Sequence, residues 1–341
     1  MDASEADSDS SDLSTAEPTF DASVIIPTFN GETYLARVLD SIYAQEFDGT
    51  VEVFVIDSGS TDGTLEIVRS RPWVRLHEIP NSEFGHGRTR NLAARMARGR
   101  LVAFLTQDAI PAGPRWLRAL TDPLDEHGMD AVAVVGKQEP RPGCFPLLKY
   151  EIEASFAQLG VGDGGGGEPI GVTASDREVV GPQVAEFYSD VNSATRRDFL
   201  VNVIPYRDVS YSEDVAFAKD LLEAGYRKAY APAAVVEHSN DLTLGEYGRR
   251  IFDEAIGTRR VGHETPNPGR VGWLAHAGVG AIRDSRRIAR DRDYSLGPKL
   301  YWLVVNPAFH LVKWRSYERA NRVDLNDHAT IAKWSLEHRR R

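Results

Sequence analysis

Residues 100–111, Arg-Leu-Val-Ala-Phe-Leu-Thr-Gln-Asp-Ala-Ile-Pro, contain the stretch that decides the fold. The run from Leu101 to Leu105 is almost continuously apolar, which is typical of a strand that is covered on both faces of a sheet. Pro111 has no backbone N–H, so we expect ladder pairing to be absent just beyond the strand. Asp108 then lies at the carboxyl end of a buried strand, where open α/β sheets bind ligands.

Working outward, apolar strands alternate with helical segments over most of the first 136 residues. The pattern predicts strands at 23–27, 51–56, 74–79, 101–106 and 131–136, and helices at 35–42, from 64, at 91–97 and at 116–121. Strands that alternate with helices pair in parallel. We therefore predict an α/β fold with a layered, parallel sheet.

The rest of the chain is less regular. Residues 137–187 show no clear period and include the Gly-rich stretch 160–167, which is either a mobile lid or a surface insertion. Ordered pattern returns at 190–197, with a helix at 213–224 and a strand at 233–237, and the chain is helical beyond about 245. Residues 1–21 hold seven acidic residues and almost no large apolar side chain, so we expect a disordered arm.

Composition narrows the class of protein. The single cysteine, Cys144, excludes an intramolecular disulfide and a zinc site built from several cysteines. No secretory signal opens the chain and no apolar run reaches the length of a membrane span, so we expect a cytoplasmic protein or one at the cytoplasmic face of a membrane. The net charge is −10, although residues 283–341 carry 14 basic against 7 acidic side chains. We expect no nucleic-acid partner.

Short polar motifs follow several of the predicted strands. After the first strand the chain reads Pro27-Thr-Phe-Asn-Gly-Glu, in which Gly31 alone fits a G-x-G-x-x-G fingerprint, and this argues against a nicotinamide or flavin enzyme. After the second strand, Asp57 is placed to accept a hydrogen bond from a base or a ribose, or else to anchor a turn. Arg88 and Arg90 lie in the first turn of a helix, where cations oppose the dipole, so either an anionic ligand or a solvated basic turn explains them.

Two further motifs lie late in the chain. Glu213 and Asp214 begin a helix, and they are either ordinary first-turn acids or a general base held at a rigid helix start. His238 follows a strand and is either structural or, with Asp108, a ligand for Mg²⁺ or Mn²⁺.

In this order the motifs resemble the family 2 inverting glycosyltransferases, which have the GT-A fold. The segments are Ser-Val-Ile-Ile-Pro-Thr-Phe-Asn-Gly at 23–31, Val-Ile-Asp-Ser-Gly-Ser-Thr-Asp-Gly-Thr at 55–64, Thr-Arg-Asn at 89–91, Phe-Leu-Thr-Gln-Asp-Ala-Ile-Pro at 104–111 and Ser-Glu-Asp at 212–214. Phe-Gly-His-Gly-Arg-Thr-Arg-Asn, Asn192-Ser-Ala and His238-Ser look most like the rhamnosyltransferase-like branch of bacteria and archaea. Two departures are Gln107 before a lone Asp108, where the family often has two aspartates, and Asn240, where this branch often has a second histidine.

The resemblance implies a GT-A domain at 22–245, a helical extension at 246–341, and transfer of a hexose or deoxyhexose with inversion. The donor would be a dTDP-, UDP- or GDP-linked sugar, and the acceptor a hydroxyl of a glycan or lipid-linked saccharide in polysaccharide or glycoprotein glycan assembly. Mg²⁺ or Mn²⁺ would be held by Asp108 and His238, and Asp214 would be the general base with Glu213 beside it. The expected donor-binding residues are Pro27, Thr28, Asn30, Asp57, Arg88, Arg90 and Gln107.

Two other functions stay open: a nucleotidyltransferase that makes sugar nucleotides, and a non-catalytic carbohydrate-binding protein on the same fold. In the extension, the aromatic segment 301–314 and the basic excess fit a helix in a membrane interface, or else a subdomain that packs Trp302, Phe309 and Trp314 onto the catalytic core. Asn306-Pro307 interrupts this segment, so we expect two short helices there.

Overall fold

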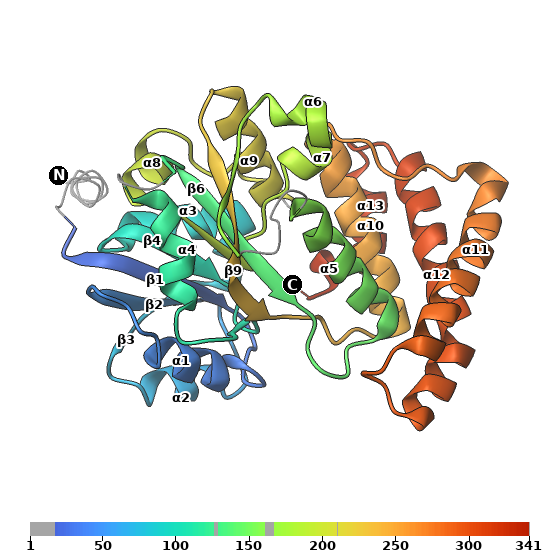
Figure 1. Cartoon of the computed structure of the whole chain (residues 1–341), viewed down its shortest axis with the longest axis horizontal. Coiled ribbons are helices and arrows are strands. Elements are labelled where there is room, and N and C mark those ends of the chain that lie inside the picture. The colour runs from blue at the N-terminus through green and yellow to red at the C-terminus, as the bar shows by residue number, and fades with distance from the viewer. Residues whose placement is uncertain (1–17, 126–128, 161–166, 210, 341) are drawn as a thin grey trace, which may run out of the picture. The chain divides into compact units, whose positions relative to one another are not determined.

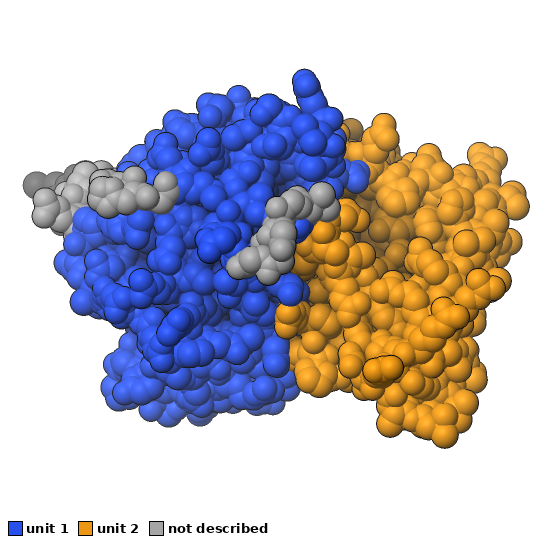
Figure 2. Space-filling view, viewed as in Figure 1, with its two compact units in different colours: residues 1–138, 159–209, 213–238 blue, residues 139–158, 210–212, 239–341 orange. Residues whose placement is uncertain are grey.

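The structure is a computed structural model, and it describes residues 18–125, 129–160, 167–209 and 211–340 (Figure 1). The chain divides into two compact units, coloured separately in Figure 2. Unit 1 comprises residues 1–138, 159–209 and 213–238, and unit 2 comprises residues 139–158, 210–212 and 239–341.

Unit 1 is built on a mixed sheet in the order β3-β2-β1-β4-β8-β6-β9-β5, with β7 paired to β9. Its strands are β1 (Phe20–Thr28), β2 (Val51–Asp57), β3 (Val74–Glu78), β4 (Gly99–Leu105), β5 (Ile110–Pro111), β6 (Ala133–Glu139), β7 (Ile170–Val172), β8 (Asn192–Arg196) and β9 (Lys228–Glu237). The first four strands in this order are parallel, whereas β8 runs antiparallel to both β4 and β6. The α/β class is as predicted, but the sheet is mixed and not wholly parallel.

The parallel part of the sheet forms where the sequence is apolar on both faces of each strand. Residues 22–26 of β1 and 101–105 of β4 are buried throughout, as expected for strands covered by helices on both sides. Helix α1 (Leu35–Tyr43) buries Leu35, Val38, Leu39 and Ile42, which share one face at helical spacing. In the register of β1 and β2, Thr28 lies opposite Asp57, so the polar ends of the two strands meet at one edge.

The other helices of unit 1 are short and flank the sheet. They are α2 (Thr64–Arg69), α3 (His86–Met96), α4 (Trp116–Thr121), α6 (Asp176–Val180), α7 (Pro182–Ala185), α8 (Arg197–Asn202) and α9 (Glu213–Glu223), with 3₁₀ turns η1 (Asn81–Glu83) and η2 (Asp122–Leu124).

Unit 2 is helical. It contains α5 (Pro146–Leu159), α10 (Leu244–Arg260), α11 (Gly269–Arg290), α12 (Leu296–Arg322), α13 (His328–Trp334) and α14 (Glu337–Arg340). Helix α10 begins at a capping box, in which Thr243 accepts from the backbone of Glu246 and the Glu246 side chain accepts in return. None of the described helices is long and apolar enough to cross a membrane.

Several expectations about local structure are corrected. Pro111 lies in β5 and pairs opposite Val236 of β9, which is possible because β5 is an edge strand and needs no N–H on its open side. The irregular region 137–187 contains the 14-residue helix α5. Strand β1 begins at Phe20, inside the expected arm, while the rest of that arm up to residue 17 and residues 161–166 of the Gly-rich stretch lie outside the described residues.

The expected break at Pro307 is also wrong, because α12 continues through it as one helix. Packing outweighs the lost hydrogen bond: Asn306 donates to the carbonyl of Ala281 on α11 at 3.0 Å. Phe309 is buried in a cluster with Phe145 and Tyr247 of the same unit, and Trp302 packs against that cluster. Inward packing therefore accounts for these aromatic side chains.

Candidate functional site

The carboxyl edge of β1 and β2 is organised by Asp57. Its carboxylate is fully buried and accepts hydrogen bonds from the Thr28 hydroxyl at 2.7 Å, the Gly59 amide at 3.0 Å, and the amide and hydroxyl of Ser60 at 2.8 and 2.6 Å. Four donors fill the four lone-pair positions of a carboxylate. The contacts that the structure gives Asp57 are thus those of a turn anchor, as are those of Thr28.

The loop after β1 is held by Gln107. The side-chain oxygen of Gln107 accepts from the Phe29 amide at 2.8 Å, and its nitrogen donates to the Phe29 carbonyl at 3.0 Å. A Cβ at Gly31 would meet the same oxygen, so an alanine there would force the Gln107 side chain to move. Asn30 is exposed, has a φ of 49° and accepts from the Thr61 amide at 2.9 Å, while Pro27 is partly buried. Gln107 thereby ties the end of β4 to this loop.

Asp108 and His238 are brought together although 130 residues separate them in the sequence. The Asp108 Oδ2 lies 3.5 Å from the His238 Nε2, and His238 is 5% exposed. On the far side of the ring, His238 Nδ1 lies 3.1 Å from Oε1 of Gln138, whose amide nitrogen donates to Ser189. Since Gln138 presents an acceptor to Nδ1, the proton of a neutral ring is on Nδ1 and the lone pair of Nε2 faces the Asp108 carboxylate.

Two acceptors that face each other fit a shared cation. The described residues include no cluster of three or more His, Cys, Asp or Glu side chains arranged to hold a metal. Mg²⁺ is commonly bound by one or two carboxylates together with substrate phosphates and water, and not by a complete protein cage. Asp108 and His238 therefore fit the protein's share of a divalent-cation site that a diphosphate completes.

Arg90 lies at the centre of a buried acidic cluster, which comprises Arg90, Asp190, Glu213 and Asp214. The Arg90 Nη1 donates to Glu213 Oε1 at 2.6 Å, and Nε lies 3.2 Å from Asp190 Oδ2. Burial works to lower the pKa of Arg90, but the Asp190 and Glu213 carboxylates outweigh it and hold that pKa above its usual range. The basic first turn of α3 is thus explained for Arg90 by carboxylates of the chain, and the expected diphosphate contact is not needed to account for it.

Asp214 is the most exposed carboxylate of this cluster. It is partly buried, and its Oδ1 and Oδ2 accept from the amides of Val215 at 2.8 Å and Asp190 at 3.4 Å. Burial, followed by the negative charges of Glu213 and Asp190, raises the pKa of Asp214 to about 8. Glu213 is 5% exposed and occupied by Arg90, so Asp214 is the carboxylate that a second molecule can reach.

Arg88 is positioned differently from Arg90. It is exposed in the first turn of α3, where its guanidinium donates to the Phe84 carbonyl at 2.9 Å. A cation at a helix start remains consistent with an anionic ligand.

Two residues of the site, Asp190 and Gln138, were not singled out from the sequence. Asp190 accepts from the hydroxyls of Ser193 and Tyr206, both at 2.7 Å, and burial raises its pKa against the effect of Arg90. Gln138 orients His238. Asp190 lies two residues before β8, but no local pattern distinguishes it from an ordinary loop aspartate.

The sequence of this chain is similar to those of known glycosyltransferases. Residues 23–150 match a family described as Glycosyl transferase family 2. The O-antigen chain rhamnosyltransferase RfbN of Salmonella typhimurium is 31% identical over 239 residues, which span 68% of this chain and 71% of that protein. The rhamnosyltransferase WbaN of Salmonella anatum is 28% identical over 241 residues, covering 70% and 72%.

Among solved structures, the mannosyltransferase PcManGT of Pyrobaculum calidifontis, in complex with GDP-Man and Mn²⁺, is similar in fold. It has a TM-score of 0.54 and 20% identity, and the match covers 91% of this chain and 89% of that one. At this identity the likeness bears on the fold alone, and it agrees with the expected GT-A architecture.

Proposed function

This chain belongs to glycosyl transferase family 2, and we propose that it transfers a sugar, with inversion, from a nucleoside-diphosphate sugar to a hydroxyl of a glycan or lipid-linked saccharide. The observation that carries the proposal is the pair of facing acceptors, Asp108 and His238, at the edge of the sheet that also bears the acidic cluster. A bound cation stabilises a diphosphate leaving group, and a carboxylate whose pKa is near the working pH can serve as the general base.

The donor would bind along the ends of β1, β2 and β4. We assign Pro27, Asn30 and the backbone of the loop after β1 to the nucleotide, with Thr28, Asp57 and Gln107 holding that loop in shape. Exposed Arg88 is the side chain that we assign to the diphosphate. Breaking the glycosidic C–O bond develops negative charge on the departing diphosphate, and a fixed cation stabilises it where it forms.

Asp108 and His238 would hold Mg²⁺ or Mn²⁺, which when bound supplies Lewis-acid stabilisation of the diphosphate leaving group. PcManGT is seen with GDP-Man and Mn²⁺, which supports a divalent ion here. The Gln138 contact fixes the ring of His238 with Nε2 toward Asp108, and it would do so with or without the ion.

Asp214 would accept the proton of the acceptor hydroxyl as that oxygen attacks the anomeric carbon. The new C–O bond forms on the face opposite the departing diphosphate, so a single displacement inverts the configuration and no covalent intermediate is needed. A carboxylate with a pKa of about 8 is a stronger base than an ordinary aspartate once it is ionised. Arg90 and Glu213 act as positioning residues, since their contacts are with the cluster itself.

The relatives support a narrower proposal. Because RfbN and WbaN are named O-antigen chain rhamnosyltransferases, we propose a deoxyhexose or hexose donor linked to dTDP, UDP or GDP. The product would belong to a cell-surface polysaccharide or a glycoprotein glycan, assembled on the cytoplasmic side.

Thermal stabilisation tests donor binding before the sugar is known. UDP, GDP and dTDP are each added with and without Mn²⁺, and at least one is expected to raise the melting temperature only when the metal is present. Asp108→Asn should remove that shift, whereas Asp48→Asn, which changes a carboxylate that is 87% exposed, should keep it. A wild-type protein that none of the three stabilises would contradict the proposal.

Product analysis then separates the other functions. A glycosyltransferase releases a nucleoside diphosphate from the sugar nucleotide, a nucleotidyltransferase exchanges pyrophosphate, and a binding protein releases neither.

A further inference from the structure

Exposed apolar side chains line one side of α11 in unit 2. Val271, Leu274 and Ile282 are 74%, 50% and 58% exposed, and with Gly278 they recur at the three- and four-residue spacing of one helical face. Val279, on the flank of this face, is 69% exposed. Exposed aliphatic side chains in such a row are unusual on a surface that meets only water.

A second row follows α12. Its members are Leu296, Leu300, Val304 and Leu311, which are 73%, 58%, 79% and 42% exposed and are spaced by four or seven residues. Tyr301 beside them is 58% exposed. We call the two rows together the apolar face of α11 and α12.

The apolar face is not what holds the two helices together. Their contact is made by other positions: Asn306 donates to the Ala281 carbonyl at 3.0 Å, and His310 Nε2 lies 3.0 Å from Asp284 Oδ2, where both side chains are buried. Buried polar side chains at other positions thus join α11 to α12, while the two rows keep much of their apolar surface exposed.

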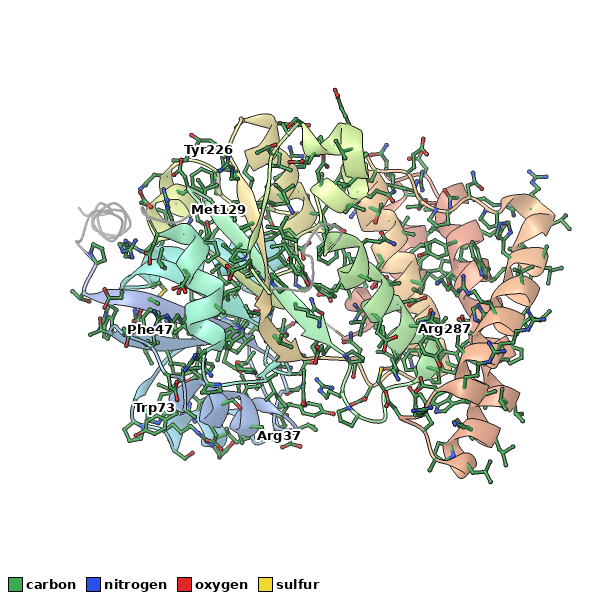
Figure 3. All side chains as sticks on the ribbon, viewed as in Figure 1. Arg37, Phe47, Trp73, Met129, Tyr226 and Arg287 are labelled. Atoms are coloured by element: carbon green, nitrogen blue, oxygen red, sulfur yellow. The ribbon has the colours of Figure 1, made fainter. Side chains whose placement is uncertain are left out.

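Basic side chains gather at the C-terminal end of the α11 row. A shallow depression of about 840 Å³ is lined by five basic residues and two acidic ones, together with Tyr150, Val279 and Ile282. Among the basic residues, Lys149 is paired with Asp291 at 2.8 Å, and Arg287, labelled in Figure 3, stacks on the Tyr150 ring at 3.8 Å.

Two of the arginines are left for an outside ligand. Within the described part of the chain, Arg286 and Arg290 have no carboxylate within 4.0 Å, and both are exposed. Arg286 lies one helical turn and Arg290 two turns beyond Ile282, on the same side of α11.

We propose that the apolar face of α11 and α12, with Arg286 and Arg290 at its edge, docks on the surface of an anionic phospholipid bilayer. An apolar row flanked by arginines is the pattern of a helix that lies in the interface plane, with aliphatic side chains at the acyl boundary and guanidinium groups on the phosphates. Arginine pairs with phosphate oxygens through two parallel N–H donors. The positive charge of Arg286 and Arg290 favours an anionic surface over a second copy of this chain, because the second copy would present the same positive charge.

This surface differs from the one expected from the sequence. The aromatic segment 301–314 suggested Trp302 and Phe309 as interfacial anchors, yet both pack in the cluster around Phe145. The aliphatic side chains that are exposed come from positions outside that segment as well as within it.

Flotation of the full chain with vesicles tests the proposal. The protein should float with vesicles of phosphatidylcholine and phosphatidylglycerol, should remain unbound with phosphatidylcholine alone, and should be released by high salt. Arg286→Gln with Arg290→Gln should weaken partitioning about 25-fold, because each basic residue near an anionic surface contributes about fivefold. Val279→Asp with Ile282→Asp should abolish it.

Matched controls come from unit 1. Val179→Asp changes an exposed aliphatic residue (81% exposed), and Arg115→Gln with Arg118→Gln changes two exposed arginines; all should bind vesicles as the wild type does. Because Arg286 and Arg290 are exposed, their variant keeps the test valid even where the Val279 and Ile282 variant fails to fold.

Three outcomes would overturn the proposal. They are no flotation of the wild type with anionic vesicles, equal flotation of the arginine variant and the wild type, or a dimer in light scattering that the Val279 and Ile282 variant loses while neither protein binds vesicles. The last outcome would assign the face to a second copy. Donor binding by thermal shift is measured separately, so failure here leaves the proposed transfer reaction standing.

Discussion

Replacement of Asp214 by Asn tests the acidic cluster through the pH dependence of stability. The pKa of Asp214 is raised from 3.8 to about 8 by burial and by the charges of Glu213 and Asp190. A carboxyl group with a folded pKa above its unfolded value binds more protons when folded. Its contribution to stability is complete below about pH 4 and is lost as the pH rises through about 8.

The size of this pH dependence follows from the single proton that Asp214 binds or releases. Between the two pKa values, the free energy of unfolding of the wild type falls by about 1.4 kcal/mol per pH unit through this group. Asn cannot ionise, so Asp214→Asn loses this dependence. The stability of the variant relative to the wild type should therefore rise by about 3 kcal/mol from pH 5 to pH 7.

Urea unfolding at pH 5, 6 and 7, followed by circular dichroism, measures this difference directly. Asp48→Asn, which removes a carboxylate that is 87% exposed, controls for the loss of a surface charge. If the difference in the free energy of unfolding between Asp214→Asn and the wild type instead stayed constant from pH 5 to 7, the Asp214 side chain would be ionised throughout. Our account of the cluster would then be refuted.

Ionisation of Asp214 lowers the stability of the protein as the pH rises, but it should increase the rate of turnover. The wild-type kcat/KM should rise about tenfold from pH 7 to pH 9, as the ionised fraction of a base with a pKa of about 8 increases. Asp214→Asn should lower kcat by roughly 10²–10⁴ and leave the nucleoside-diphosphate thermal shift in place. If Glu213→Gln were the more damaging change, the roles of the two carboxylates would have to be exchanged.

Four further substitutions have defined outcomes. Asp108→Ala and His238→Gln should each abolish the Mn²⁺-dependent thermal shift and the turnover; unchanged activity of the Asp108 variant would exclude the metal assignment. Gly31→Ala should cost about 1–3 kcal/mol in urea unfolding and weaken nucleotide binding, because the new Cβ displaces a Gln107 side chain that makes two hydrogen bonds. Asp284→Ala should destabilise the protein by about 3–5 kcal/mol at neutral pH, since it leaves His310 and Arg283 without their shared carboxylate; a loss below 1 kcal/mol would contradict this.

Much of unit 1 could be predicted from local pattern. The apolar runs of β1, β2 and β4 specify buried strands, and the polar residues after them, Asp57 and Asp108, lie where the carboxyl ends of parallel strands meet. The helix that carries Asp214 begins at Glu213 as predicted, whereas the helix that carries Arg88 begins at His86, before the predicted residue 91. These features depend on residues within a few positions of one another, and periodicity records them directly.

The partners of those residues depended on the tertiary structure. Arg90 and Glu213 are 123 residues apart, and whether the guanidinium meets a ligand or a carboxylate is decided by how α3 and α9 pack. Likewise, Pro307 reads as a helix break, yet the packing of α12 against α11 keeps the helix whole. A sequence pattern shows which side chains are to be buried, but strand order and helix packing determine which buried charges face each other, because Coulomb and hydrogen-bond energies depend on distance in space and not along the chain.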